Sequence, residues 1–129
     1  DVEIIYPVHL NPNVRKPVFD LLEDIENIHL IEPLQYEEFI YLMDKTYFIL
    51  TDSGGIQEEA CLLGVPCITL RENTERPITI EMGNNELVQL NASFISKRMV
   101  EKLKSDQKGT IPPLWDGHAT ERILEIIRK

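Results

Sequence analysis

The residues best suited to holding an anion lie at one strand-to-helix junction. Thr51-Asp52-Ser53-Gly54-Gly55 follows an apolar strand and leads directly into a helix. In a parallel sheet such a turn lies at the carboxyl ends of the strands, where open α/β folds bind ligands. The two glycines allow close backbone approach, and exposed N–H groups with the helix dipole favour an anion. Two interpretations stay open from local chemistry: a phosphate site with Ser53 as a donor, or a tight turn with Ser53 as the helix cap.

Two glutamates on the following helix are expected to differ in environment. Ile56, Ala60 and Leu63 form one apolar face, which places Glu59 on its flank and Glu58 in solvent. A carboxylate beside an apolar face needs a hydrogen-bonding partner, and the paired hydroxyls of a ribose would provide one. Glu59 is therefore the candidate ribose ligand.

Arg76 belongs to a polar segment, residues 71–77, that follows the fourth expected strand. This segment should reach the same edge of the sheet, and a guanidinium fork suits a phosphate or a carboxylate. The alternative is a surface arginine paired with Glu72 or Glu75.

Two further side chains are weaker candidates. His9 lies in the loop after the first expected strand, where a lone histidine is more often structural than catalytic. Phe39, on the second expected helix, is most simply a core residue but could stack under a flat base.

The sequence gives little support for a metal site or for the common ATP- and NAD-binding motifs. Three histidines and two cysteines are too scattered for a metal motif, and neither a P-loop nor a Gly-x-Gly-x-x-Gly pattern is present. Cys61 and Cys67 are expected to be buried thiols in a reducing cytoplasm rather than a disulfide.

The elements that position these residues alternate along the chain. Strands are expected at 2–6, 27–31, 47–51, 66–70 and 87–90, and helices at 14–24, 36–45, 56–63, 92–104 and after Asp116, with one short helix inside 71–83. Gly64 should cap the third helix in a left-handed conformation. This alternation predicts an α/β fold, a Rossmann-like parallel sheet with helices on both faces, in a single domain over residues 1–129.

Composition limits the partners. The 129-residue chain has 13 Lys plus Arg against 22 Asp plus Glu, a formal net charge of −9, which argues against nucleic-acid binding. One diphosphate can still be held by local dipoles in an acidic protein. No apolar run is long enough for a bilayer and no secretory signal is visible, so we expect no membrane association and a cytoplasmic location.

Four segments, in order, closely resemble the non-hydrolysing UDP-N-acetylglucosamine 2-epimerases: residues 6–15 (YPVHLNPNVR), 51–60 (TDSGGIQEEA), 71–77 (RENTERP) and Asp116-Gly117. The resemblance runs along essentially the whole chain. It implies the carboxyl-terminal lobe of a two-lobed, glycosyltransferase-B-type enzyme, a lobe that holds most of the UDP. The amino-terminal lobe and the first βα unit of this lobe are expected to be missing, so that the lobe is truncated.

Carried over residue by residue, the resemblance implies UDP-binding roles for Phe39, Ser53, Gly54, Gly55, Glu59 and Arg76. Ser53 and Gly55 would meet the diphosphate, Glu59 the ribose and Phe39 the uracil, while Arg76 would be a further substrate-site residue. His9 would line a cleft where some bacterial members bind a second, regulatory UDP-sugar.

The resemblance also implies a reaction. UDP is eliminated across C1 and C2 of the sugar and is added back after C2 has been protonated from the other face. UDP-GlcNAc and UDP-ManNAc are thereby interconverted, with no redox cofactor and no metal. The acid/base carboxylates of the family lie in the amino-terminal lobe. We therefore expect no catalytic residue in this chain, no activity from it alone, and a homodimer for the full-length enzyme.

Two alternatives stay open beside the isomerase. The chain could be the donor-binding lobe of a UDP-sugar glycosyltransferase, which has a comparable ribose glutamate, or a non-catalytic UDP-binding module. Thr74-Glu75-Arg76-Pro77 favours the epimerase over the glycosyltransferase.

Overall fold

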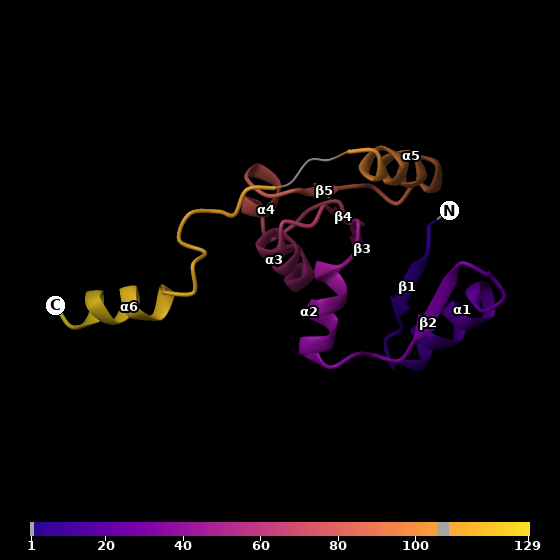
Figure 1. Cartoon of the computed structure of the whole chain (residues 1–129), viewed down its shortest axis with the longest axis horizontal. Coiled ribbons are helices and arrows are strands. Elements are labelled where there is room, and N and C mark those ends of the chain that lie inside the picture. The colour runs from indigo at the N-terminus through magenta and orange to yellow at the C-terminus, as the bar shows by residue number, and fades with distance from the viewer. Residues whose placement is uncertain (1, 106–108) are drawn as a thin grey trace. The chain divides into compact units, whose positions relative to one another are not determined.

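The computed structural model describes residues 2–105 and 109–129 (Figure 1). Helices and strands alternate through most of this length, as the sequence predicts. The chain divides into two compact units, Asp1–Phe39 and Ile40–Lys129, which are described separately.

The first unit is a single βαβ motif followed by the start of a helix. Strand β1 (Ile4–Pro7) pairs in parallel with β2 (Ile28–Ile31), with Ile4 opposite Ile28. Helix α1 (Pro12–Leu22) connects them, and the side chain of Asn11 caps it by accepting the N–H of Asn13 at 3.0 Å. A parallel pair needs such a crossover, which explains why a helix separates two neighbouring strands.

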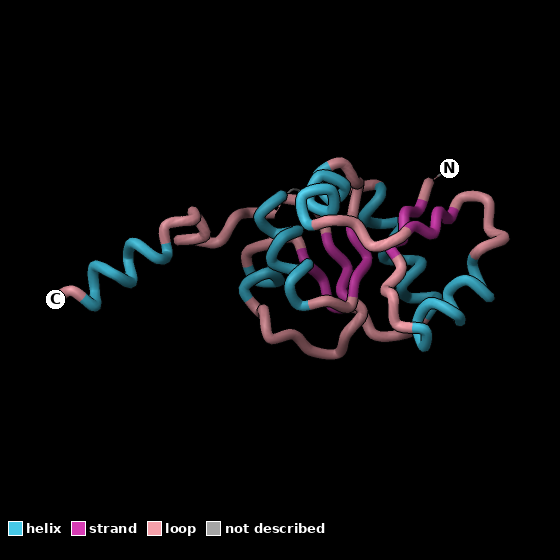
Figure 2. The backbone as a smooth tube through the Cα atoms, turned by 90° about the horizontal axis from the view of Figure 1, so that it is seen from below, coloured by secondary structure: helices cyan, strands magenta, loops and turns pink. Residues whose placement is uncertain are grey.

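The second unit contains the remaining sheet. Helix α2 (Tyr36–Asp44) spans the boundary between the units and leads into β3 (Ile49–Thr51). There follow α3 (Gly54–Leu63), β4 (Cys67–Thr69), α4 (Ile78–Glu81), β5 (Asn85–Leu87), α5 (Ala92–Leu103) and α6 (Ala119–Ile127). Strands β3, β4 and β5 are parallel in that order, so that β4 is central; Figure 2 shows the three strands side by side among the helices.

The apolar core of the second unit surrounds β4, all three residues of which are buried. Its buried apolar residues are Met43, Ala60, Cys61, Val65, Cys67, Ile68 and Val88. The apolar area that they remove from water is the main favourable contribution to the stability of this unit.

Two glycines fix the backbone beside this core. Gly64 ends α3 with φ of 69°, in the left-handed conformation predicted for it. Gly83 is required by close packing, because a Cβ there would lie 2.6 Å from the Cys61 sulfur and even closer to the Thr79 carbonyl oxygen.

Three details differ from the sequence-based expectation. Within the described residues the strands form a two-stranded and a three-stranded parallel sheet, where we expected one sheet. The last strand lies at Asn85–Leu87 instead of 87–90. The buried face of α3 runs through Gln57, Ala60 and Cys61 and not through Ile56 and Leu63. Assignment of the whole chain to a single domain stays a prediction.

None of the helices in the described residues combines the length and apolar character needed to cross a bilayer.

Candidate functional site

The turn between β3 and α3 has the backbone geometry of a helix start. Ser53 occupies the N-cap position with φ of −84° and ψ of 136°, and its own N–H donates to the Thr51 hydroxyl at 3.0 Å. The Ser53 hydroxyl makes no capping hydrogen bond, so of the two roles considered for it, the structure does not show the cap. The N–H groups of the first helical turn have no partner within a helix and can be offered to an anion.

Another side chain occupies the space beside Gly54. A Cβ on Gly54 would collide with the Oε1 atom of Glu75. Glu75 in turn pairs with Arg71, whose Nη1 lies 3.0 Å from Oε2. A hydrogen bond from its own backbone N–H, with the charge of Arg71, holds the pKa of Glu75 below the usual range. The segment after β4 therefore lies directly against the glycine turn, at the carboxyl end of the strands.

Arg76 comes from the same segment and meets α3 through Glu58. Its Nε lies 2.9 Å from Glu58 Oε1, although this N–H makes no hydrogen bond among the described residues. Its Nη1 donates to the Glu75 carbonyl at 3.3 Å. Glu58, expected to be a solvated surface charge, is partly exposed but is also the acidic partner of Arg76, in place of the expected Glu72 or Glu75. The two side chains are each 38% exposed, so a ligand can still reach the guanidinium.

Glu59 lies on the open side of α3 and not on the flank of its buried face. It lines an open pocket of about 340 Å³ together with Gly55, Glu58, Leu62 and Trp115. The same pocket therefore contains one residue of the glycine turn and the candidate ribose ligand. Trp115 adds an aromatic wall that the sequence did not single out.

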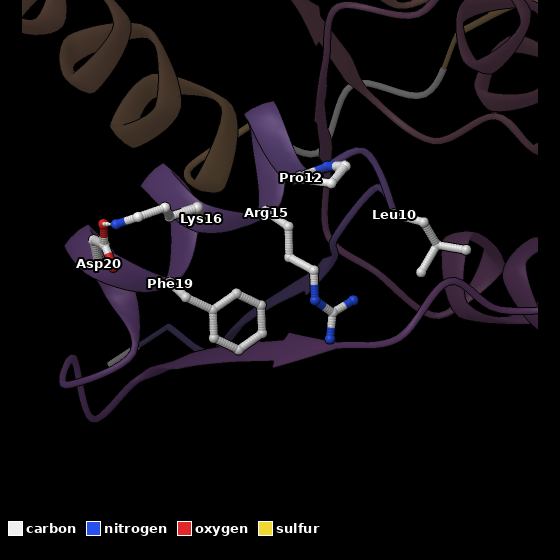
Figure 3. Close-up of a pocket in the computed structure, with 6 residues that line it drawn as sticks. All are labelled: Leu10, Pro12, Arg15, Lys16, Phe19 and Asp20. Atoms are coloured by element: carbon white, nitrogen blue, oxygen red, sulfur yellow. Dashed lines mark hydrogen bonds and ion pairs between the residues drawn. The ribbon is translucent and has the colours of Figure 1, made fainter.

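The other two candidates belong to the first unit. His9 is exposed, and its Nδ1 accepts the N–H of Asn11 at 3.1 Å in the loop before α1. Phe39 is half-buried on α2. A shallow hollow on this unit is lined by Leu10, Pro12, Arg15, Lys16, Phe19 and Asp20, and His9 is not among its lining residues (Figure 3).

The prediction that both cysteines are buried is confirmed. Cys61 and Cys67 are buried and are not joined in a disulfide. Burial raises the pKa of Cys67 to about 11 and raises that of Cys61 as well, which keeps both thiols protonated at neutral pH. The described residues contain no group of three His, Cys, Asp or Glu side chains placed to hold a metal ion.

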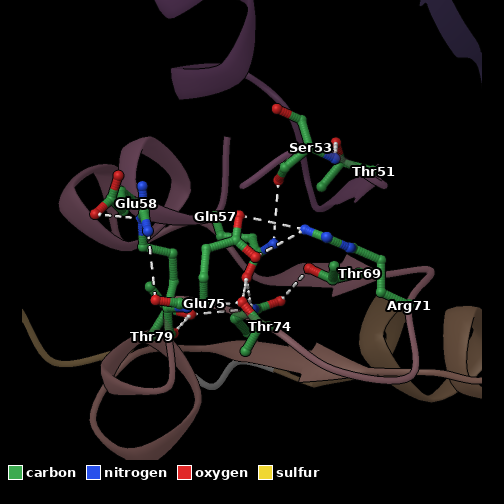
Figure 4. Close-up of polar contacts among 11 residues, drawn as sticks. Thr51, Ser53, Gln57, Glu58, Thr69, Arg71, Thr74, Glu75 and Thr79 are labelled. Carbon is green, nitrogen blue, oxygen red and sulfur yellow. Dashed lines mark hydrogen bonds and ion pairs between the residues drawn. The ribbon is translucent and has the colours of Figure 1, made fainter. Parts of the chain in front are cut away.

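Sequence reasoning missed Gln57, Glu58 and Trp115. Gln57 is polar yet fully buried, and Figure 4 shows its side chain between the glycine turn and the segment that carries Thr74 and Glu75. Periodicity gives no signal for such a residue, since a buried face is recognised by its apolar members.

Comparison with known proteins gives a consistent family. The family model for UDP-N-acetylglucosamine 2-epimerase matches residues 1–128. The UDP-N-acetylglucosamine 2-epimerase of Campylobacter jejuni is 52% identical over 134 residues, which cover 100% of this chain and 35% of that protein. The enzyme of the same name from Neisseria meningitidis serogroup A is 57% identical over 130 residues, covering 97% and 35%. The chain thus spans about a third of the length of these relatives.

Solved structures that resemble this chain belong to the same family. The UDP-GlcNAc 2-epimerase of Methanocaldococcus jannaschii, in complex with UDP-GlcNAc and UDP, superposes with a TM-score of 0.84 at 43% identity, covering 98% of this chain and 35% of that one. The Neisseria meningitidis enzyme bound to UDP-GlcNAc gives a TM-score of 0.87 at 42% identity, with the same coverage. The α/β class and the likeness to one lobe of a larger enzyme are therefore confirmed.

Proposed function

This chain belongs to the UDP-N-acetylglucosamine 2-epimerase family, and we propose that it forms the UDP-binding, carboxyl-terminal part of such an enzyme. The observation that carries the proposal is the placement of Gly55 and Glu59. Both line one pocket, which runs along the open face of α3 from Gly55 in its first turn to Leu62 near its end.

Each residue then has a defined role. The N–H groups of the turn, those of Gly54 and Gly55 included, receive the diphosphate together with the Ser53 hydroxyl, and the space beside Gly55 is open for its approach. Glu59 accepts hydrogen bonds from the ribose hydroxyls. Arg76 supplies positive charge, for which the diphosphate competes with Glu58. For the first unit, the family resemblance supports two separate roles: Phe39 stacks on a uracil base, and His9 belongs to a cleft that binds UDP-sugar.

The reaction of the whole enzyme requires two kinds of group. Negative charge on the leaving UDP must be stabilised, which the glycine turn and Arg76 are suited to do. A proton must also be removed from C2 and returned to the other face, which requires acid/base groups outside this chain. We propose interconversion of UDP-GlcNAc and UDP-ManNAc by a cytoplasmic homodimer, with this chain contributing the nucleotide site.

Isothermal titration calorimetry with UDP tests the nucleotide site directly. The chain should bind UDP, and Glu59→Ala should weaken binding by about 1–3 kcal/mol, as expected when a charged hydrogen-bond partner is removed. Glu125→Ala removes an exposed carboxylate from α6 and serves as the matched control, with unchanged affinity expected.

Each outcome has a separate meaning. Absence of UDP binding to the unaltered chain contradicts the proposed function of this part. Binding that Glu59→Ala leaves unchanged removes the ribose assignment while leaving the nucleotide site in place. Equal losses in Glu59→Ala and Glu125→Ala would point to net charge and not to a specific contact.

A further inference from the structure

A buried polar cluster lies behind the glycine turn, in the second unit. Gln57, Thr69 and Thr79 are completely buried and Asn85 is 6% exposed; half-buried Thr74 completes the cluster (Figure 4). These five side chains come from α3, β4, α4, β5 and the segment that leads to Arg76. Polar groups are costly to bury, so their hydrogen bonds must be satisfied internally.

Gln57 links the turn to that segment. Its Nε2 donates to the Ser53 carbonyl at 3.2 Å, which fixes the backbone at the start of α3. Its Oε1 accepts from the Thr74 hydroxyl at 2.7 Å and from Asn85 Nδ2 at 3.1 Å. The buried side-chain amide of Gln57 therefore binds the Ser53 turn through its N–H and the segment that carries Thr74 through its oxygen.

The backbone of Arg76 is fixed through the same cluster. Its N–H donates to the Thr74 hydroxyl at 2.9 Å, and its carbonyl accepts from the Thr79 hydroxyl at 2.8 Å. Thr79 in turn accepts from Asn85 Nδ2 at 3.0 Å. Both backbone groups of Arg76 thus connect to Gln57 through one or two further hydrogen bonds.

Asn85 is fixed from the opposite side by Thr69, whose hydroxyl donates to Asn85 Oδ1 at 2.7 Å. Its amide orientation follows, because only the Nδ2 end can then donate to Gln57 and Thr79. The donors and acceptors of the cluster consequently admit one arrangement. In a buried, low-dielectric setting such a fully satisfied network specifies geometry as well as stability.

We propose that Gln57 is a positioning residue for the diphosphate site, which it aligns by holding the Ser53 turn and the Arg76 backbone in one register. The proposal rests on the UDP-binding function proposed above. Gln57 itself does not touch the ligand: it acts through Ser53 on one side and through Thr74 on the other. Anion binding by backbone N–H groups depends on their direction, so a small rotation of either segment weakens the site.

Thr74 offers the sharpest test, because it joins Gln57 to the Arg76 backbone. Thr74→Val removes the hydroxyl at nearly constant volume, while Thr74→Ser retains it. Calorimetric titration with UDP is carried out at a temperature where circular dichroism shows all three proteins to be folded. We expect Thr74→Val to bind UDP about tenfold more weakly, and Thr74→Ser to bind within about twofold of the unaltered chain.

A purely structural cluster would give another result: Thr74→Val would melt at a lower temperature while its folded form kept the UDP affinity. That outcome overturns the positioning role and leaves the proposed function intact. Absence of UDP binding to the unaltered chain overturns both.

Nuclear magnetic resonance of the unaltered chain provides a readout that does not depend on whether a variant folds. UDP should shift the side-chain amide signals of Gln57 and slow their hydrogen exchange, since ligand binding restrains the two segments that this amide joins. The side-chain amide of Asn27, which donates to the Val2 carbonyl at 2.9 Å in the first unit, is the internal control. If the Gln57 signals respond to saturating UDP no more than those of Asn27, the positioning role is wrong.

Discussion

In the first unit, Asp1–Phe39, Val8 is the one buried apolar side chain among the described residues, whereas the second unit, Ile40–Lys129, has seven. Strand β1 shows the contrast with β4: Ile4 and Ile5 are 37% and 47% exposed, and every residue of β4 is buried. Both strands belong to parallel pairings with helical connections, so topology alone does not decide burial. Burial of a strand depends instead on whether further helices or strands pack against it.

This difference in burial between the two units also determines which candidate site residues have a fixed position. The carbonyls of Ser53 and Arg76 are held by hydrogen bonds from Gln57 and Thr79, two side chains buried against the β4 core. His9 makes one local hydrogen bond in an exposed loop. The diphosphate end of the proposed UDP site is therefore pre-organised in this chain to a degree that the His9 segment is not.

The largest difference is expected when one strand isoleucine is truncated in each unit. Ile68→Ala in β4 should lower the free energy of unfolding by about 2–5 kcal/mol, because it leaves a cavity in a closed core. Ile5→Ala in β1 should cost less than about 1 kcal/mol, since that side chain already contacts water. Urea unfolding of both variants gives the two values. Similar losses would show that the units are equally well packed and would remove the contrast.

Burial in the second unit should also appear as a pH dependence. The pKa of Cys67 is raised to about 11 in the folded chain, above the ordinary thiol value of 9.0. The folded state therefore holds this proton more tightly, and the stabilisation is complete below pH 9 and is lost as pH rises towards 11. By pH 10 the loss should be about 1 kcal/mol.

Urea unfolding at pH 7 and pH 10 measures this loss, with Cys67→Ala as the control that lacks the thiol. The unaltered chain should lose more stability than the variant over this interval. Equal losses would mean that other groups, such as tyrosines and lysines, account for the whole alkaline effect.

The smallest effect is expected at the surface of the first unit. Arg15 forms an ion pair with Glu32 and lies 5.1 Å from the centre of the Phe19 ring. Hydrogen bonding to Arg15 lowers the pKa of Glu32, so any stabilisation is present above the ordinary carboxyl pKa and is lost as pH falls through the lowered value. Because the pair is solvent-exposed, Glu32→Gln should shift the urea midpoint only slightly at low salt. The shift should disappear in 1 M NaCl if charge is its source; a shift that persists there would indicate a packing role.

Much of the fold follows from local sequence signals. The apolar residues of 47–51 and the glycines that follow predict a strand, a turn and a helix, and β3, Ser53 and α3 confirm the order. The helix begins at Gly54 and not at Ile56, because glycines carry no periodic signal even where they are helical. The predicted position of β5 was two residues too late for a related reason. Its first residue, Asn85, is polar, and the hydrogen bonds that allow its burial come from Gln57, Thr69 and Thr79, which are distant in sequence.

The site was predictable in its motifs but not in its internal contacts. Glycines after a strand and a glutamate one turn later are local features, and the structure places Gly55 and Glu59 on one pocket. The pairing of Glu58 with Arg76 joins residues from different segments, and Trp115 reaches α3 from beyond α5. Such contacts depend on tertiary packing, which a pattern of residue types does not contain.

Gly83 shows how unevenly this chain can tolerate genetic variation. A single methyl group there would have to displace the Thr79 carbonyl or the Cys61 sulfur, and the hydroxyl of the same Thr79 carries the bonds to Asn85 and Arg76. The outer residues of α6, by contrast, have neighbours on few sides and can change with little effect on the second unit's core. A random library of variants should therefore retain glycine at 83 almost without exception, although no ligand is expected to touch it.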